Sequence, residues 1–298
     1  MITATSLMPV KKPFPAYRRT PYSDPLRKKP MTIAAGFKYS DGILLCADRE
    51  ITEGASKYAK SKIFGEQIGP DVSLGFSFSC AMNYAVMTIQ GITAIVKSSH
   101  LTSHAQIWLA IKDTIHDVYS DSIGRLPEYQ QENFQFSLLI AVWAERHLKL
   151  FTTENTAITE EPQYHCIGIG KDLAKYLVTS IDSKKSNRMS LQNAEIVSLR
   201  ILEHVKENVP GCGKEMDALI MGADGSLIRK NQSDYRYQLK LIDAYDSMAS
   251  LLFTFATDLD ISDSERDFGF WTAMDAYKKN LSLARAERLA EQQDNEGE

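Results

Sequence analysis

The order of strand-like and helix-like segments is the feature that most limits how this chain can fold. Short apolar or alternating stretches are followed by two segments of helical periodicity, and this succession occurs twice before a last strand. Such an order favours two sheets packed together between layers of helices. The expected strands are residues 33–39, 43–47, 57–64, 136–143, 147–152, 164–169 and 216–221, and the expected helices are 83–100, 103–120 with Ser103 as N-cap, a helix from 171, and 191–206.

The beginning of the sequence differs in composition from the rest. Residues 1–30 contain seven Lys or Arg side chains, the single acid Asp24 and six of the ten prolines. Proline lacks a backbone N–H, and a charged segment buries little apolar surface. We therefore expect residues 1–31 to be a basic, proline-rich disordered leader or a mis-called translation start. Binding of nucleic acid and targeting to an organelle are less favoured roles for it.

The remaining chain divides into a folded domain and an extension. We expect the domain to span residues 32–245 and a charged helical extension to span residues 246–298. Within the extension, Met274, Tyr277, Leu281 and Ala284 lie on one face of an expected helix rich in Lys, Arg and Glu.

Composition excludes several classes of protein. No apolar run approaches the roughly 20 residues of a membrane-spanning helix, so we expect no membrane partner. We also expect a cytoplasmic protein without a nucleic-acid partner. The cysteines form no CxxC pair and have no histidine at metal-ligand spacing, so we expect buried thiols, no metal and no other cofactor. Cys212, flanked by Gly211 and Gly213, is an alternative nucleophile, although no base lies near it in the sequence. The four cysteines are Cys46, Cys80, Cys166 and Cys212.

Three polar residues are expected to meet at one edge of a sheet. Counting residue pairs through the turn at residues 40–42 places Thr32 and Asp48 at the same end of a hairpin. Counting through a second turn at residues 53–56 places Lys62 opposite about Ala47. Taken alone, this geometry favours a routine ion pair between Asp48 and Lys62 at a strand end.

Two segments resemble a known family. Residues 32–52, which read TIAAGFKYSDGILLCADREIT, resemble the opening of a proteasome β-subunit. Residues 60–64, which read KSKIF, resemble the segment that carries the family's catalytic lysine. The similarity covers about residues 32–222. It implies the α+β, four-layer αββα sandwich of N-terminal nucleophile hydrolases and a threonine-type peptidase. It also implies Thr32 as nucleophile, Asp48 as buried carboxylate and Lys62 as catalytic lysine.

These residue types suit that chemistry. A threonine hydroxyl is a poor nucleophile, but the α-amine of an N-terminal residue, with a pKa of about 8, is a base near neutral pH. Lys62 would supply positive charge that favours deprotonation of the hydroxyl, and Asp48 would hold Lys62 charged and oriented. Backbone N–H donors would stabilise the oxyanion that forms on the substrate.

The sequence departs from the family pattern at four positions. Ser79 falls near the position of the family's oxyanion-hole glycine, where a side chain crowds a close approach. Ile169, between Gly168 and Gly170, stands where the family usually has a serine. Glu207 and Pro210 stand where active members have an aspartate and a serine. We expect Glu207 to keep the role of supporting acid, whereas Pro210 cannot supply a hydroxyl.

The resemblance also implies partners. The family works in closed rings, so we expect a homo-oligomeric ring or a ring with related subunits, and a peptide or protein substrate. Apolar helices such as residues 83–100 are candidates for the ring contacts. The sequence has no Walker-type phosphate loop, so any ATP dependence would come from a separate ATPase or unfoldase.

Two alternatives to a threonine peptidase remain at this stage. One is a non-catalytic scaffold subunit in which Thr32 is never exposed, and the other is a hydrolase of small amides. The catalytic alternatives require Thr32 at the N-terminus, either by removal of Met31 as an initiator methionine or by self-cleavage between Met31 and Thr32. We expect a start at Met31, because the family's self-cleaving subunits usually have a glycine before the threonine.

Overall fold

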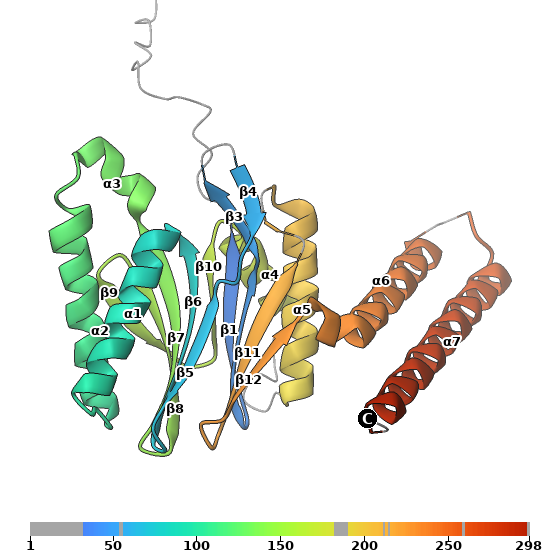
Figure 1. Ribbon diagram of the computed structural model, residues 1–298. Coiled ribbons are helices and arrows are strands. Elements are labelled where there is room, and N and C mark those ends of the chain that lie inside the picture. Colours follow the sequence, from blue (N-terminus) through green and yellow to red (C-terminus); the bar gives the residue numbers. More distant parts are fainter. Residues whose placement is uncertain are drawn as a thin grey trace, which may run out of the picture.

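Two antiparallel five-stranded sheets lie face to face (Figure 1). This computed structural model describes residues 32–53, 56–181, 190–210, 212–213, 215–257 and 260–296, so the expected leader, residues 1–31, lies outside the described residues. The strand order is β10-β1-β2-β11-β12 in the first sheet and β5-β6-β7-β8-β9 in the second. Their bounds are β1 Ile33–Tyr39, β2 Gly42–Asp48, β5 Ile63–Ile68, β6 Val72–Cys80, β7 Phe136–Ala144, β8 His147–Glu154, β9 Ala157–Glu161, β10 Tyr164–Gly168, β11 Met216–Gly222 and β12 Leu227–Asn231.

Helices cover the outer face of each sheet. Helices α1 (Met82–Ser98) and α2 (His104–Val118) form one outer layer, with α1 packed on β6 and β7. Helices α4 (Lys171–Ile181) and α5 (Leu191–Asn208) form the other, with α5 packed on β1 and β2. The expected αββα sandwich is therefore confirmed.

The period of two in the strands separates the layers of the core. In β6, Leu74, Phe76 and Phe78 belong to the apolar cluster under α1 and α2. The alternate residues face the opposite sheet: the Ser73 hydroxyl donates to the Gly225 carbonyl at 2.6 Å. By the same alternation, Ser77 and Ser79 project into the space between the sheets, where Ala34, Leu45 and Leu139 are among the buried side chains.

The N-cap expected for α2 is present. The Ser103 side chain accepts a hydrogen bond from the Gln106 N–H, and the Gln106 side chain accepts one from the Ser103 N–H. This reciprocal arrangement satisfies two N–H groups that the first turn of a helix leaves without partners.

The expected strand at residues 57–64 is wrong. Residues on its two sides belong to different sheets: β4 (Ser56–Ala59) pairs with β3 (Glu50–Glu53), whereas β5 belongs to the second five-stranded sheet. Residues 60–62 connect the two-stranded sheet of β3 and β4 to the second five-stranded sheet and do not continue a strand. Strands β6, β9 and β12 and the short helix α3 (Glu128–Phe134) were not predicted.

The C-terminal part is a helical hairpin. Helices α6 (Arg236–Thr257) and α7 (Asp263–Glu296) lie side by side and extend away from the sandwich on the side of α5 (Figure 1). The α6 helix runs without a break through residues 245 and 246, the expected boundary, so the helical segment begins at Arg236. No helix among the described residues is long and apolar enough to cross a membrane.

Candidate active site

Thr32, Asp48 and Lys62 meet at one end of the sandwich. Thr32 directly precedes β1, Asp48 is the last residue of β2, and Lys62 directly precedes β5. All three are buried, with exposed fractions of 3%, 0% and 2%. The structure thus brings together the three side chains that the sequence placed at one edge.

The Asp48 carboxylate is the centre of this cluster. Its Oδ1 accepts hydrogen bonds from Thr32 Oγ1 at 2.6 Å, Lys62 Nζ at 2.8 Å and the Ile33 N–H at 2.9 Å. Its Oδ2 accepts from the Gly213 N–H at 2.9 Å and the Glu50 N–H at 3.2 Å. A buried carboxylate with this number of donors and a cation beside it is satisfied and fixed in orientation.

The Lys62 ammonium also donates a hydrogen bond to Thr32 Oγ1. The cation therefore contacts both the hydroxyl and the carboxylate. Burial lowers the pKa of Lys62 below its ordinary value of 10.5, and the charge of Asp48 opposes this lowering. We expected Lys62 to lie opposite about Ala47. This was wrong, because Ala47 pairs with Ala34 in β1 and with Asp217 in β11. Lys62 reaches Thr32 from the connection between the two-stranded β3–β4 sheet and β5.

Gly168 fixes the backbone of Thr32. It pairs with Ile33 at the end of β10 and has a φ of +94°. A Cβ at this position would lie 2.2 Å from the Thr32 carbonyl oxygen, so only glycine fits there. Ile169, one of the four departures from the family pattern, is 47% exposed. An exposed isoleucine gives the nucleophile no hydrogen bond, in agreement with the departure seen in the sequence.

We expect Gly168→Ala to lower the free energy of unfolding by about 3 kcal/mol, because it adds a backbone clash to an unfavourable φ. Gly69→Ala is the matched control, since Gly69 has a φ of +69° and no atom within 4 Å of an added Cβ. It should cost only about 1 kcal/mol. Urea unfolding of both variants measures the difference. Equal costs for the two would show that the contact with Thr32 does not constrain the site.

Ser79 is buried, but the sheet directs its N–H away from β5. Ala81 N–H donates to the Gln135 carbonyl at 3.3 Å, and Ser79 pairs with Ser137 in the same register. Hydrogen-bonded pairs alternate in an antiparallel ladder, so the Ser79 N–H points to β7. The next N–H, that of Cys80, points to the other edge of β6, the edge that pairs with β5. The pairing with β5 ends at Ser77, before Cys80. Cys80 has a φ of +73°, a conformation that favours glycine.

The Ser79 side chain has a different environment from its backbone. It is 1% exposed, and its hydroxyl has no hydrogen-bond partner among the described residues. Because β6 alternates between its two faces, this hydroxyl projects between the sheets. The expectation that this side chain crowds a close approach to the oxyanion hole stays a prediction.

The support expected from Glu207 is not seen, and Pro210 supplies no hydroxyl, as expected from its residue type. Both residues are exposed, and no hydrogen bond between described residues joins Glu207 to Thr32, Asp48 or Lys62. The residue of this segment that reaches the cluster is Gly213, through its N–H. A glycine N–H carries no signal in the sequence, because any residue type except proline has one.

Cys212 lies beside the cluster as a buried thiol. Burial, together with the nearby Asp48 charge, raises its pKa to about 12, although Lys62 opposes the shift. A thiol with such a pKa stays protonated near neutral pH, so Cys212 is not the nucleophile that the sequence allowed as an alternative. The described residues contain no cluster of His, Cys, Asp or Glu that could hold a metal ion.

Comparisons with known proteins agree with this architecture. The family model for the proteasome subunit matches residues 31–221, and no curated protein matches the chain. A mutant Anbu from Hyphomicrobium sp. has a TM-score of 0.64 at 14% identity, over 78% of this chain and 99% of its own. Anbu from Yersinia bercovieri, described as an ancestral beta-subunit, has a TM-score of 0.62 at 15% identity, over 78% and 100%. Anbu from Pseudomonas aeruginosa, solved as a helical assembly, has 0.62 at 13%, over 78% and 99%.

Proposed function

Because the chain belongs to the proteasome subunit family, we propose that it is a threonine-type hydrolase of peptide bonds with Thr32 as its nucleophile. The observation that carries the proposal is the buried contact of Thr32 Oγ1 with both the Lys62 ammonium and the Asp48 carboxylate. A surface ion pair at a strand end needs neither this burial nor a hydroxyl in contact with both of its charges.

The reaction needs a free α-amine at Thr32. While Met31 precedes it, the Thr32 nitrogen is part of an amide and cannot act as a base. Once free, the amine accepts the proton of the Thr32 hydroxyl, and Oγ1 attacks the carbonyl carbon of the substrate. The protonated amine then gives its proton to the leaving nitrogen, and an ester remains on Thr32. Water cleaves this ester and restores the hydroxyl.

Lys62 and Asp48 have separate roles in this proposal. The Lys62 ammonium stabilises the negative charge that develops on Oγ1 during attack, because it already donates a hydrogen bond to that atom. Asp48 orients Lys62, and its hydrogen bonds to the N–H groups of Ile33 and Gly213 hold it in place. We assign the oxyanion donor to the Cys80 N–H instead of that of Ser79, because the Cys80 N–H points away from β7.

The pH dependence of kcat/KM should have two limbs. The rate should rise as the α-amine loses its proton, near pH 8 for an amine of ordinary pKa. It should fall where Lys62 becomes neutral, at a pH below 10.5, because burial lowers the pKa of this lysine. Initial rates on a fluorogenic peptide between pH 6 and pH 11 would show both limbs. A rate still rising at pH 10.5 would contradict a role for charged Lys62.

Translation frames provide the direct experiment. Protein made from a frame that starts at Met31 should lose its initiator methionine before the small residue Thr32, and should hydrolyse peptides. Protein made from the full 298-residue sequence should do so only if the chain cuts itself before Thr32. If both proteins begin at Thr32 and neither cleaves a panel of peptides or an unfolded protein, the proposed function is wrong.

A non-catalytic scaffold subunit is the second candidate function. It is favoured by the exposed Ile169 and by the exposed positions of Glu207 and Pro210. In either function we propose association with further copies of the chain, in the cytoplasm, and with a separate ATPase for folded substrates. The experiment with the two frames separates the candidates, because the scaffold, in which Thr32 is not normally exposed, would show no hydrolysis even when the frame that starts at Met31 frees Thr32.

A further inference from the structure

The end of the α6–α7 hairpin carries exposed aromatic side chains. Phe253 near the end of α6 and Phe268 and Trp271 near the start of α7 are 70%, 75% and 60% exposed. We call these three residues the aromatic tip. Apolar residues occupy several sides of both helices there, since Phe255 packs on Gly269 between them. A helix end that is apolar on more than one side is normally buried against another surface.

The aromatic tip is surrounded by acidic residues. Asp260, Asp263, Glu265 and Asp267 are all exposed in the same stretch. Its basic residue, Arg266, donates to the carbonyl groups of Ala256 and Ile261 and so closes the end of the hairpin. The tip therefore has an apolar centre with a negative rim.

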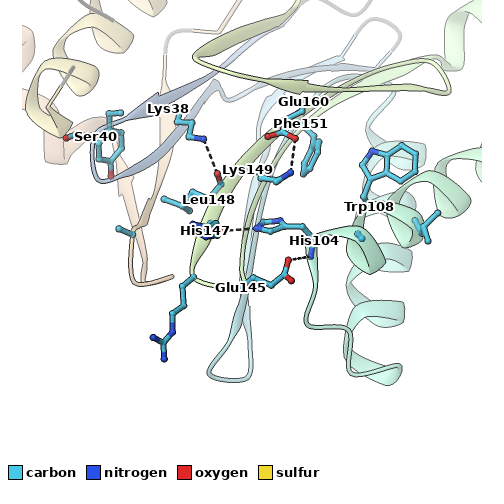
Figure 2. A pocket seen from close by; sticks show the side chains of 15 residues that line it. Lys38, Ser40, His104, Trp108, Glu145, His147, Leu148, Lys149, Phe151 and Glu160 are labelled. Atoms are coloured by element: carbon cyan, nitrogen blue, oxygen red, sulfur yellow. Dashed lines mark hydrogen bonds and ion pairs between the residues drawn. The ribbon is translucent and has the colours of Figure 1, made fainter. Parts of the chain in front are cut away.

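A cavity on the opposite side of the molecule has the complementary character. It has a volume of about 1070 Å³ and lies between α2, the β7–β8 turn and the end of β1. Figure 2 shows Trp108 and Phe151 on one side of it and Lys38 and Lys149 nearby. Leu109, which is 49% exposed, adds apolar surface. We call this the basic cavity.

The acids of the basic cavity already have partners. The Glu145 carboxylate accepts a hydrogen bond from the His104 N–H at 2.9 Å, at the start of α2. The Glu160 carboxylate pairs with Lys149 at 2.9 Å. Arg146, by contrast, is exposed, and no hydrogen bond or ion pair between described residues holds its guanidinium. Arg146 is thus a positive charge available to an incoming acidic group.

The turn that carries Arg146 is in an unfavourable conformation. Glu145 and Arg146 have φ values of +51° and +61° in the two-residue turn between β7 and β8. Such turns usually contain Asn or Gly, so two larger charged residues cost stability there. The Glu145 hydrogen bond to α2 offsets part of this cost, and the turn presents Arg146 at the edge of the cavity.

We propose that the aromatic tip of one copy of the chain binds in the basic cavity of the next copy. Charge complementarity selects this occupant, because the acidic rim would meet the Arg146 guanidinium and the Lys38 ammonium at the lining of the cavity, whereas Lys149 is already paired with Glu160. In Figure 1 the hairpin extends from the side of α5, whereas α2 lies on the opposite side, so one molecule cannot fill its own cavity. A contact between two different surfaces repeats head to tail and produces a ring or a helix of copies.

This inference rests on the association of copies in the proposed function, but not on catalysis. Its readout is the size of the assembly, which does not require hydrolysis by Thr32. Loss of activity with intact assembly would contradict the hydrolase alone, and loss of the contact in an active protein would contradict this inference alone.

Two variants and their mixture test the contact on the full chain. The tip variant is Phe268→Ser with Trp271→Ser, and the cavity variant is Leu109→Glu with Arg146→Glu. All four side chains are exposed, so both variants should keep the circular dichroism spectrum and melting temperature of the unmodified chain. Tyr129→Ser, at an exposed aromatic residue elsewhere, is the control. Sedimentation velocity measures the size of each species.

The unmodified chain and the control should form species larger than dimers. Each variant alone should be monomeric, with association weakened by about 30-fold or more, the effect of losing a buried aromatic anchor. An equimolar mixture of the two variants should form one-to-one dimers and nothing larger, because only one intact contact is then possible. A monomeric unmodified chain, a variant that assembles like it, or a mixture that stays monomeric would overturn the proposal.

Discussion

Thr32→Ala should lower the rate of peptide hydrolysis by about 10⁴-fold or more, because it removes the attacking oxygen and leaves only binding and oxyanion stabilisation. The fold should remain. Asp48 keeps its hydrogen bonds to Lys62, Ile33 and Gly213 in this variant. The lost hydrogen bond from the hydroxyl should cost only about 1 kcal/mol of the free energy of unfolding. Steady-state hydrolysis and urea unfolding measure the two effects.

The control for this variant is Thr32→Ser. Serine keeps the hydroxyl and the α-amine, so hydrolysis should remain within roughly 100-fold of the unmodified protein, on the scale of a misplaced reacting group. If Thr32→Ala and Thr32→Ser lose activity equally, the hydroxyl is not the nucleophile. If Thr32→Ala retains its activity, a different residue carries the reaction.

Lys62→Met should have the largest effect on stability, about 3–5 kcal/mol, because it leaves the Asp48 carboxylate buried without a countercharge. Asp48 is fully buried, and Lys62 is the cation in contact with it. Activity should be lost as well, since no other cation among the described residues contacts Thr32 Oγ1. Urea unfolding followed by tryptophan fluorescence measures the change in free energy.

Two further variants show whether the cause is the unpaired charge. Lys62→Met combined with Asp48→Asn should recover part of the lost stability, because the double variant has no buried charge. Lys57→Met removes a lysine from its ion pair with Glu50, where the lysine side chain is 45% exposed. It should cost less than about 1 kcal/mol. A double variant less stable than Lys62→Met would contradict the electrostatic explanation.

Much of the fold could be predicted because its signals are local. The first hairpin follows from the turn at residues 40–42, and the start of α2 follows from Ser103 and Gln106. The convergence of Thr32 and Asp48 also follows, since both belong to one hairpin. These features depend on residues that are close in sequence, so their spacing carries the information.

The parts that failed depend on contacts between distant segments. Lys62 lies in the connection between the two-stranded β3–β4 sheet and β5. Counting residue pairs along one sheet therefore placed it near Thr32 and Asp48 correctly, but with a pairing that does not exist. The orientation of the Ser79 N–H depends on its pairing with Ser137, and no pattern near Ser79 reveals that register. The N–H of Gly213 carries no signal at all. The α6–α7 hairpin was only half predicted: a helix was expected around residues 274–284 of α7, whereas no helix was predicted over Arg236–Thr257.

The N-terminal residue, measured together with activity in the same preparation, tests the central claim most directly. Intact mass gives the fraction of chains that begin at Thr32, and hydrolysis of a peptide gives the rate. Across preparations from the two translation frames, the rate should be proportional to that fraction and zero when no chain begins at Thr32. A preparation in which every chain retains Met31 and which still hydrolyses the peptide at the full rate would contradict the account.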